Sequence, residues 1–530
     1  MDPLRHSAAH VLAQAVKRLY PKARLGIGPP IEDGFYYDID LPKPITDSDL
    51  PKIEQEMQKI IKENHSFKQS HKPRAEALKE FKQANDAFKA EIVQDLTEEE
   101  KVSFYTDGEF VDLCAGPHVA STGEIKAVKL LSVAGAYWRG RETNPQLTRI
   151  YGTAFNSKKD LDAFLKLREE AKERDHRKLG KALGLFTVLE EAGAGLVFYL
   201  PKGAKVREAI EQYLKEAHLK RGYQPVGTPH LLRANIWEQS GHYEHYKENM
   251  YVFKVENQEM GLKPMNCPGH ILIYKTALHS WREMPLRLFE LGTVYRNEKS
   301  GVLHGLLRVR GFTQDDAHIF LRPSQLEAEI SDVLQFVFET MKTFGFTDYK
   351  MDLSTRPTDF MGDAAKWDHA EDILRRVLEK SGVEFSVQTG EGAFYGPKID
   401  IQVRDALKRV WQCATIQLDF VLPERFKLTY VEEDGKPTAP VMVHRAILGS
   451  MERFIGMLIE HYGGAFPTWL APTQLTIVPI AEAHRDYANE LLKQATDRGI
   501  RAEVDQRNER MQAKIRDAQG NNVSVRMRGI

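Results

Sequence analysis

Two segments set the architecture expected for this chain: Leu288-Phe-Glu-Leu-Gly-Thr-Val-Tyr-Arg-Asn-Glu298 and, after a glycine-containing loop, Gly305-Leu-Leu-Arg-Val-Arg-Gly-Phe-Thr-Gln-Asp-Asp-Ala-His318. The first is typical of a strand that ends in Arg296 and Glu298, and the second of a returning strand that carries Arg308. The planar guanidinium of arginine holds a phosphate in one orientation. The pattern therefore predicts an antiparallel pair of strands with an anion-binding end.

Two further features extend this sheet. Strand candidates at 394–403 and 408–420 are separated only by the polar turn Asp405-Ala406-Leu407. So short a connection favours antiparallel strands over parallel strands joined by a helix. Arg453 is expected in the opening turns of a helix, where the helix dipole also favours anions.

Length and composition indicate several globular domains. The chain has 530 residues, of which 42% are hydrophobic and 28% charged, with a net charge of −1. A domain takes roughly 100–200 residues, so about three are expected. The near-neutral balance excludes a uniformly basic nucleic-acid coat, although basic residues exceed acidic ones from Arg498 onward. We predict an α+β domain over 1–155, an exposed linker helix over 156–181, the main sheet domain over 182–468 and a small α/β domain over 469–530.

The chain carries no sign of export. It has three scattered cysteines, no apolar run of the roughly 20 residues that would span a bilayer, and no signal-peptide core after Met1. We therefore expect a cytoplasmic protein that does not enter a membrane.

Histidine and cysteine pairs occur at the amino-terminal end. His6 and His10 are four residues apart on a predicted helix, so their rings share one face. Cys114 and His118 repeat the spacing in a turn that contains Pro117. The four groups suit tetrahedral zinc by ligand type. They equally suit a metal-free pocket that orients water, and local hydrogen bonding by each ring is a third alternative.

Three other candidate ligands are isolated in sequence. Cys267 lies in Lys263-Pro-Met-Asn-Cys-Pro-Gly-His270, where we expect proline-containing turns rather than helical packing to fix its position. His318 and His444 have no partner nearby in the chain. A lone cysteine is more often a small buried residue than a ligand, and the residues alone do not join these three.

Longer motifs resemble the threonyl-tRNA synthetase family. The segments 6–10, 28–38 and 112–118 are similar to its editing domain, and 263–270, 295–298 and 308–318 to its catalytic core. The resemblance implies a class II antiparallel-sheet core, an amino-terminal α+β editing domain and a carboxy-terminal α/β anticodon-binding domain. It also implies ligation of L-threonine to tRNA(Thr) through threonyl-adenylate, with ATP and Mg²⁺, in a homodimer formed around 221–229.

The resemblance assigns a role to each candidate residue. One Zn²⁺ per chain would be held by Cys267, His318 and His444. The threonine pocket would include Asp316, Gln314 and Tyr395. The nucleotide would be bound by Arg296, Glu298, Arg308 and Arg453, with Lys398 near the reacting groups and His242 assisting the ribose hydroxyl.

The zinc and the amino-terminal pocket would solve different selection problems. A metal that binds the threonine amine and hydroxyl rejects valine, which lacks the hydroxyl. Serine differs by one methyl group, worth only about 1–3 kcal/mol, so a second site must hydrolyse Ser-tRNA(Thr). The resemblance gives this role, without a required metal, to His6, His10, Cys114 and His118, with Asp112 and Tyr37 beside them.

Two departures from the family and two alternatives remain. The chain opens at the editing helix without the ubiquitin-like domain of many members, and the segment after Gln519 is shorter than usual. A noncatalytic RNA-binding regulator on the same scaffold would show no threonine-dependent ATP–pyrophosphate exchange. Testing serine, valine and proline in that assay would distinguish a synthetase for another amino acid from one for threonine.

Overall fold

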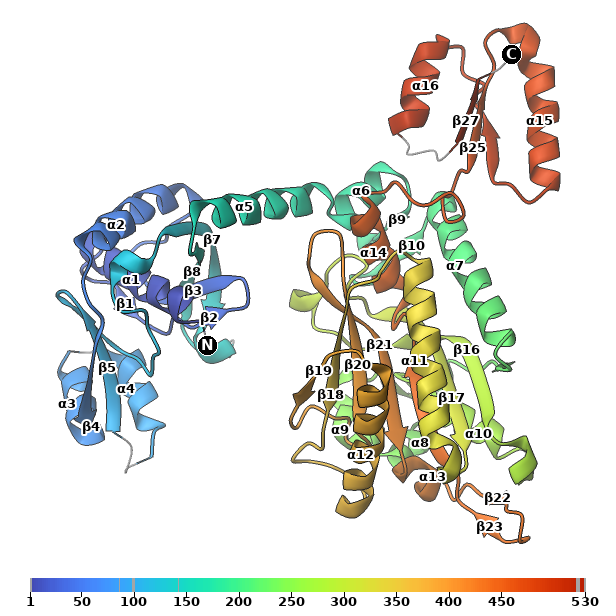
Figure 1. Cartoon of the computed structure of the whole chain (residues 1–530), viewed down its shortest axis with the longest axis horizontal. Coiled ribbons are helices and arrows are strands. Elements are labelled where there is room, and N and C mark those ends of the chain that lie inside the picture. The colour runs from blue at the N-terminus through green and yellow to red at the C-terminus, as the bar shows by residue number, and fades with distance from the viewer. Residues whose placement is uncertain (1, 85, 98–100, 142, 521–524, 529–530) are drawn as a thin grey trace. The chain divides into compact units, whose positions relative to one another are not determined.

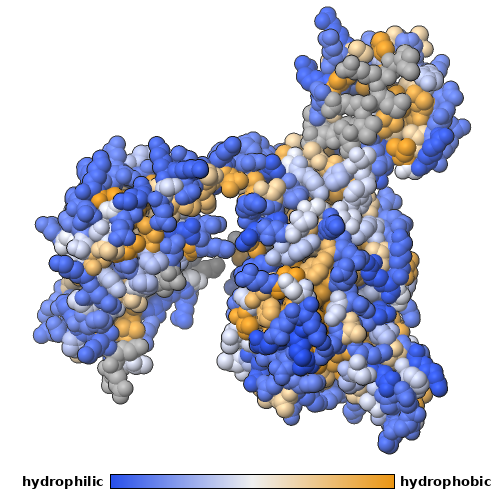
Figure 2. Space-filling model, in the orientation of Figure 1, coloured by the Kyte–Doolittle hydropathy of each residue, from blue (hydrophilic) through white to orange (hydrophobic). Residues whose placement is uncertain are grey.

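The computed structural model, drawn in Figure 1, describes residues 2–84, 86–97, 101–141, 143–520 and 525–528. Residues 521–524, within the segment that departs from the family pattern, lie outside this description. The chain forms two compact units, Met1–Glu169 and Glu170–Ile530. The face drawn in Figure 2 is hydrophilic over most of its area. In the described ranges, no helix is long and apolar enough to cross a membrane.

The first unit is built around helix α1 (Pro3–Leu19), which confirms the predicted opening helix. The Asp2 side chain accepts hydrogen bonds from the first backbone N–H groups and so caps the helix. Helix α1 packs against α2 (Leu50–Glu63) and against a sheet of order β1-β3-β8-β7, with β2 added to β3. The strands are β1 (Arg24–Leu25), β2 (Pro30–Ile31), β3 (Gly34–Asp40), β7 (Ala127–Tyr137) and β8 (Gln146–Phe155).

A smaller antiparallel sheet completes this unit. Its order is β4-β5-β6, and Ala77, Val93, Val102 and Phe104 form its hydrophobic core. The elements are β4 (Lys68–Pro73), α3 (Arg74–Gln83), α4 (Ala87–Gln94), β5 (Lys101–Asp107) and β6 (Phe110–Leu113).

The predicted linker contains two helices rather than one. Helix α5 (Lys158–Glu173) ends before Asp175, whose side chain caps α6 (His176–Ala182). The expectation of an exposed helix is wrong for the start of α6, because His176 is fully buried and pairs with Glu460. Helix α6 therefore belongs to the second unit.

The second unit contains the predicted antiparallel sheet. Eight strands of the described chain run in the order β11-β16-β17-β24-β21-β20-β18-β19, antiparallel except for the two outermost pairs. They are β11 (Gln224–Pro225), β16 (Leu286–Tyr295), β17 (Gly311–Leu321), β18 (Tyr349–Ser354), β19 (Phe385–Gln388), β20 (Lys398–Arg404), β21 (Val410–Asp419) and β24 (Val441–Ala446).

The two predicted pairs of strands are confirmed, with shifted ends. Strands β16 and β17 pair antiparallel, but Arg296, Glu298 and Arg308 lie in the loop between them rather than on the strands. This loop carries its own turns and backbone hydrogen bonds, so the sheet pairing stops short of the charged residues. Strands β20 and β21 pair across the predicted turn at Asp405.

Helices α7 (Pro201–Leu219), α11 (Leu326–Thr343), α12 (Ala364–Ser381) and α14 (Met451–Tyr462) share one hydrophobic core with this sheet. Arg453 lies in the first turn of α14, as predicted. Cys267 begins helix α10 (Cys267–Tyr274), so the expectation that turns alone fix its position is wrong. Pro268 favours that helix start, because proline at the first turn loses no helical hydrogen bond.

Shorter elements surround the sheet. The strands are β9 (Phe186–Thr187), β10 (Phe198–Tyr199), β12 (Leu231–Arg233), β13 (Val252–Val255), β14 (Gln258–Leu262), β15 (His279–Ser280), β22 (Tyr430–Val431) and β23 (Pro437–Thr438). The helices are α8 (Ala234–Ser240), α9 (His242–Tyr246) and α13 (Val421–Arg425).

The end of the chain has the predicted α/β pattern. Strand β25 (Leu475–Val478) pairs parallel with β26 (Ala502–Val504) and β27 (Val525–Arg528). Helices α15 (Arg485–Asp497) and α16 (Met511–Gly520) accompany the three strands.

Candidate functional sites

Strand register brings the three isolated ligand candidates together. His318 on β17 lies directly opposite His444 on β24, and Cys267 begins α10. Ligand atoms of the three side chains lie within 4.8 Å of one another. All three residues are buried, with exposed fractions of 5% or less.

The hydrogen bonds behind these side chains suit a metal. His444 Nε2 lies 2.8 Å from Asp419 Oδ2. This contact places the ring proton on Nε2 and leaves the lone pair of His444 Nδ1 able to bind a metal. His318 Nδ1 lies 2.8 Å from His270 Nδ1. Within the described residues, no hydrogen bond joins Cys267, His318 and His444 to one another. A thiolate and two imidazoles held in this way fit zinc and leave a coordination position open.

Polar side chains continue from this cluster along β17. Gln314, Asp316 and His318 alternate along the strand and so face the same side of the sheet. Asn266 Nδ2 donates to Asp316 Oδ2 at 2.9 Å. Tyr395 Oη donates to Gln417 Oε1 at 2.6 Å. A cavity of about 180 Å³ is lined by seven of the predicted residues: Cys267, Arg296, Gln314, Asp316, His318, Tyr395 and His444.

The other predicted residues of the core do not line this cavity. Arg308 Nε lies 3.0 Å from Glu298 Oε2 in the loop between β16 and β17. Arg453 Nε donates to Leu307 O at 3.2 Å, so the helix α14 supports the same loop.

Lys398 and His242 lie near the cavity wall. Lys398 is directly opposite Gln417 in the sheet, and its Nζ pairs with Asp400 Oδ2 at 2.7 Å. His242 is fully buried, with Nδ1 2.8 Å from Ser240 Oγ and Nε2 3.8 Å from Cys267 Sγ.

Three residues of this site were not among those predicted from the sequence: Asn266, Thr415 and Gln417. Thr415 and Gln417 line the cavity. The alternation Thr415-Ile-Gln417-Leu-Asp419 marks a polar face in an otherwise apolar strand, and this signal could have identified the two residues.

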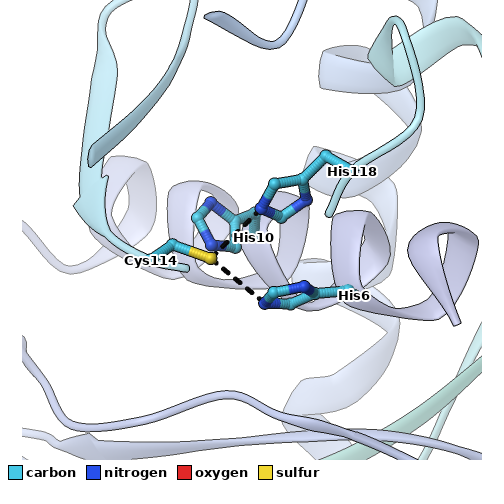
Figure 3. Close-up of side chains that lie close together, drawn as sticks. All are labelled: His6, His10, Cys114 and His118. Atoms are coloured by element: carbon cyan, nitrogen blue, oxygen red, sulfur yellow. Dashed lines mark hydrogen bonds between the residues drawn. The ribbon is translucent and has the colours of Figure 1, made fainter. Parts of the chain in front are cut away.

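The amino-terminal cluster forms as the spacing predicts. His6 and His10 extend from one face of α1, and Cys114 and His118 reach them from the segment after β6 (Figure 3). Cys114 Sγ lies 3.2 Å from His6 Nε2 and 3.2 Å from His118 Nε2. The two imidazoles thus converge on the thiol.

Hydrogen bonds at the Nδ1 atoms of His6 and His118, away from Cys114, fix the tautomers of these two rings. His6 Nδ1 lies 3.1 Å from the Pro117 carbonyl, which can only accept, so Nε2 carries the lone pair. His118 Nδ1 lies 3.0 Å from Ser7 Oγ, whose proton is donated to Pro3 O. His118 therefore also presents an unprotonated Nε2. Burial lowers the pKa of His118 to about 2 and raises the pKa of the Cys114 thiol to about 11.

A cavity of about 510 Å³ opens beside this cluster. Its wall includes a buried charged group: Lys89 Nζ pairs with Asp112 Oδ1 at 2.7 Å, and Tyr37 Oη donates to the same carboxylate. Asp112 and Tyr37 line this cavity together with His6 and His10. Lys89 was missed, because one lysine in a polar helical stretch carries no distinguishing signal.

Comparisons with known proteins identify three regions. Residues 102–151 match the threonyl and alanyl tRNA synthetase second additional domain. Residues 251–462 match the tRNA synthetase class II core domain (G, H, P, S and T). Residues 474–527 match an anticodon binding domain.

Two curated relatives that match nearly all of this chain are threonine–tRNA ligases. A threonine–tRNA ligase from Acetivibrio thermocellus is 54% identical over 98% of this chain and 81% of its own length. One from Clostridium tetani is 55% identical over 97% of this chain and 80% of its own length.

Solved structures agree with this similarity. The RNA-binding domain of threonyl-tRNA synthetase from Cryptosporidium parvum covers 66% of this chain and 88% of its own, at 43% identity and a TM-score of 0.65. A putative threonyl-tRNA synthetase from Aeropyrum pernix covers 66% and 83%, at 32% identity and a TM-score of 0.59.

Proposed function

This chain belongs to the threonyl-tRNA synthetase family, and on this basis we propose how its residues divide the reaction. It is a threonine–tRNA ligase, which joins threonine to tRNA in an ATP-dependent reaction. The class II core carries the aminoacylation, and the domain matched at 102–151 is of the type associated with editing. Members of the family use Mg²⁺ with ATP.

In the proposed threonine site, Cys267, His318 and His444 hold one zinc ion. When bound, zinc supplies a Lewis-acidic position that recognises the threonine amine and hydroxyl together. Asp316 is placed on the same face as His318 and would bind the ammonium group. The proposal rests mainly on one observation: two histidines pair across adjacent strands beside a cysteine and a carboxylate.

Arginines at the loop between β16 and β17 would position ATP. Arg296 lines the cavity and would bind the α-phosphate, while Glu298 would bind the adenine. Arg308 and Arg453 would hold the remaining phosphates. Lys398 would stabilise the charge that develops during adenylate formation, and His242 would assist the attacking ribose hydroxyl.

The amino-terminal pocket would hydrolyse Ser-tRNA(Thr) without a metal. His6 and His118 present unprotonated Nε2 atoms, so His6 can take a proton from water, and His118, whose pKa is lowered to about 2, can accept a hydrogen bond from it. The large cavity suits an aminoacylated nucleoside, and the Lys89–Asp112–Tyr37 group supplies fixed polar partners in its wall. His10 and Cys114 complete the pocket.

Domain roles and assembly follow from the same proposal. We assign editing to 1–155, the linker to 156–181, aminoacylation to 182–468 and anticodon binding to 469–530. The segment 221–229 would contribute to a homodimer. Three free cysteines fit a reducing, cytoplasmic location.

Amino-acid-dependent ATP–pyrophosphate exchange tests the synthetic part. Threonine should support exchange, serine should support it more weakly, and valine should be refused by about 10⁴-fold or more. Absence of threonine-dependent exchange, or valine activation close to that of serine, would contradict the proposed site.

A further inference from the structure

A buried histidine connects helix α6 to the loop between β16 and β17. His176 is fully buried at the start of α6. Its Nδ1 lies 2.6 Å from Glu460 Oε1 on α14, and its Nε2 accepts a hydrogen bond from the Leu306 backbone N–H at 3.0 Å. Helices α6 and α14 are neighbours in the fold (Figure 1).

The hydrogen bonds define the state of this imidazole. A backbone N–H can only donate, so Nε2 must carry a lone pair, and the proton of the neutral ring is on Nδ1. That proton is donated to Glu460. Glu460 also pairs with Arg409 Nη2 at 2.5 Å, so the carboxylate is held from a second side.

The loop is shaped to admit this ring. A Cβ atom on Gly305 would lie 2.1 Å from His176 Nε2, far inside contact distance, and Gly305 has φ +50°. Arg453 Nε holds the next carbonyl, Leu307 O. Arg308, which follows directly, pairs with Glu298. The contact with His176 therefore fixes the backbone two residues before a proposed phosphate ligand.

We propose that His176 is a positioning residue for nucleotide binding: it holds the loop that presents Arg308 and Glu298 in its ATP-binding conformation. The inference rests on the proposed nucleotide site. In this role His176 does not contact the substrate itself. Loss of the Leu306 hydrogen bond should weaken ATP binding, because the loop would then have to be ordered when ATP binds.

Two substitutions separate the contacts of His176. In His176→Asn the amide is placed near Nδ1, where it still donates to Glu460 but does not reach Leu306. In His176→Gln the longer amide brings an acceptor to the position of Nε2. We expect KM for ATP in threonine-dependent exchange to rise about tenfold in His176→Asn, the scale of one lost hydrogen bond, and to stay within about threefold of wild type in His176→Gln. KM for threonine and hydrolysis of Ser-tRNA(Thr) should change less than about twofold in both variants.

The outcomes distinguish this inference from the proposed function. If wild type lacks exchange, the proposed function fails. If wild type is active and both variants keep its KM for ATP, or raise the KM for ATP and for threonine together, the positioning role is wrong. If His176→Asn does not fold, Gly305→Ala tests the same contact from the loop, and an unchanged KM for ATP in that variant would overturn the inference.

Discussion

The two cysteine–histidine clusters contain similar groups but differ in whether those groups hydrogen-bond to one another. In the amino-terminal cluster, Cys114 Sγ lies within hydrogen-bond distance of both His6 and His118. In the core cluster, ligand atoms of Cys267, His318 and His444 lie within 4.8 Å of one another, but each described hydrogen bond leads outward, to residues such as His270 and Asp419.

This difference indicates which cluster needs an ion. Groups that hydrogen-bond to one another, as Cys114 does with His6 and His118, are stable without a metal. In the core, side chains that are held from outside converge without bonding to one another, as the ligands of a metal do. We therefore expect zinc in the core and none in the amino-terminal pocket.

The largest expected effect is loss of threonine activation in Cys267→Ser. Exchange should fall by more than about 10⁴-fold, because the group that recognises the hydroxyl is lost. Cys413→Ala is the matched control: Cys413 is also free and buried, and its Sγ lies 3.8 Å from Met457 Sδ within the hydrophobic core of the sheet. Near-normal exchange in Cys267→Ser would remove the core cluster from catalysis.

The next effect concerns editing. His6→Ala combined with His10→Ala should slow hydrolysis of preformed Ser-tRNA(Thr) by about 10²–10⁴-fold, the usual contribution of a general base. Threonine-dependent exchange should be unchanged, because the two residues lie in the other unit. Normal clearance of Ser-tRNA(Thr) by the double variant would exclude the pocket from the reaction.

A smaller effect, on zinc affinity, is expected at Asp419, which contacts His444 of the core cluster. Asp419→Asn replaces the carboxylate that holds His444 Nε2. Zinc affinity, measured by competition with a chelator, should fall about 10–100-fold. An unchanged zinc affinity would show that the hydrogen bond between His444 and Asp419 does not help to form a metal site.

The amino-terminal cluster was more predictable from the sequence than the core cluster. The spacing of His6 and His10 on one helix predicted half of the amino-terminal cluster directly. His318 and His444 meet only through the register of β17 and β24, a long-range pairing that local patterns do not encode. The family resemblance was needed to join them to Cys267.

The errors have physical causes as well. Arg308 was expected on a strand, but the loop before β17 forms its own backbone contacts. The linker segment 156–181 was predicted to be exposed because it is highly charged. His176 is nevertheless buried, because it contacts α14 and the loop between β16 and β17, which are both distant in sequence. Single residues such as Lys89 and His176 acquire their roles from tertiary contacts alone.

The smallest effect is a missing response to pH. Burial lowers the pKa of His6 below the ordinary value of 6.5 and that of His118 to about 2, so His118 stays neutral as pH falls through 6.5 and His6 is protonated less than an ordinary histidine. An ordinary histidine would be about three-quarters protonated at pH 6. Single-turnover hydrolysis of Ser-tRNA(Thr) should therefore change less than about twofold between pH 7.5 and 6. An acid limb centred near pH 6.5 would contradict the neutral-base assignment.

The contrast between the clusters is tested by counting zinc per chain in purified wild type, Cys267→Ser and Cys114→Ser. We predict about one zinc, none and one, respectively, because the three core groups suit zinc by ligand type and form no described hydrogen bonds with one another, whereas Cys114 is bonded to two rings of its own cluster. Two zinc ions in wild type with one remaining in Cys114→Ser, or one zinc retained in Cys267→Ser, would contradict this account.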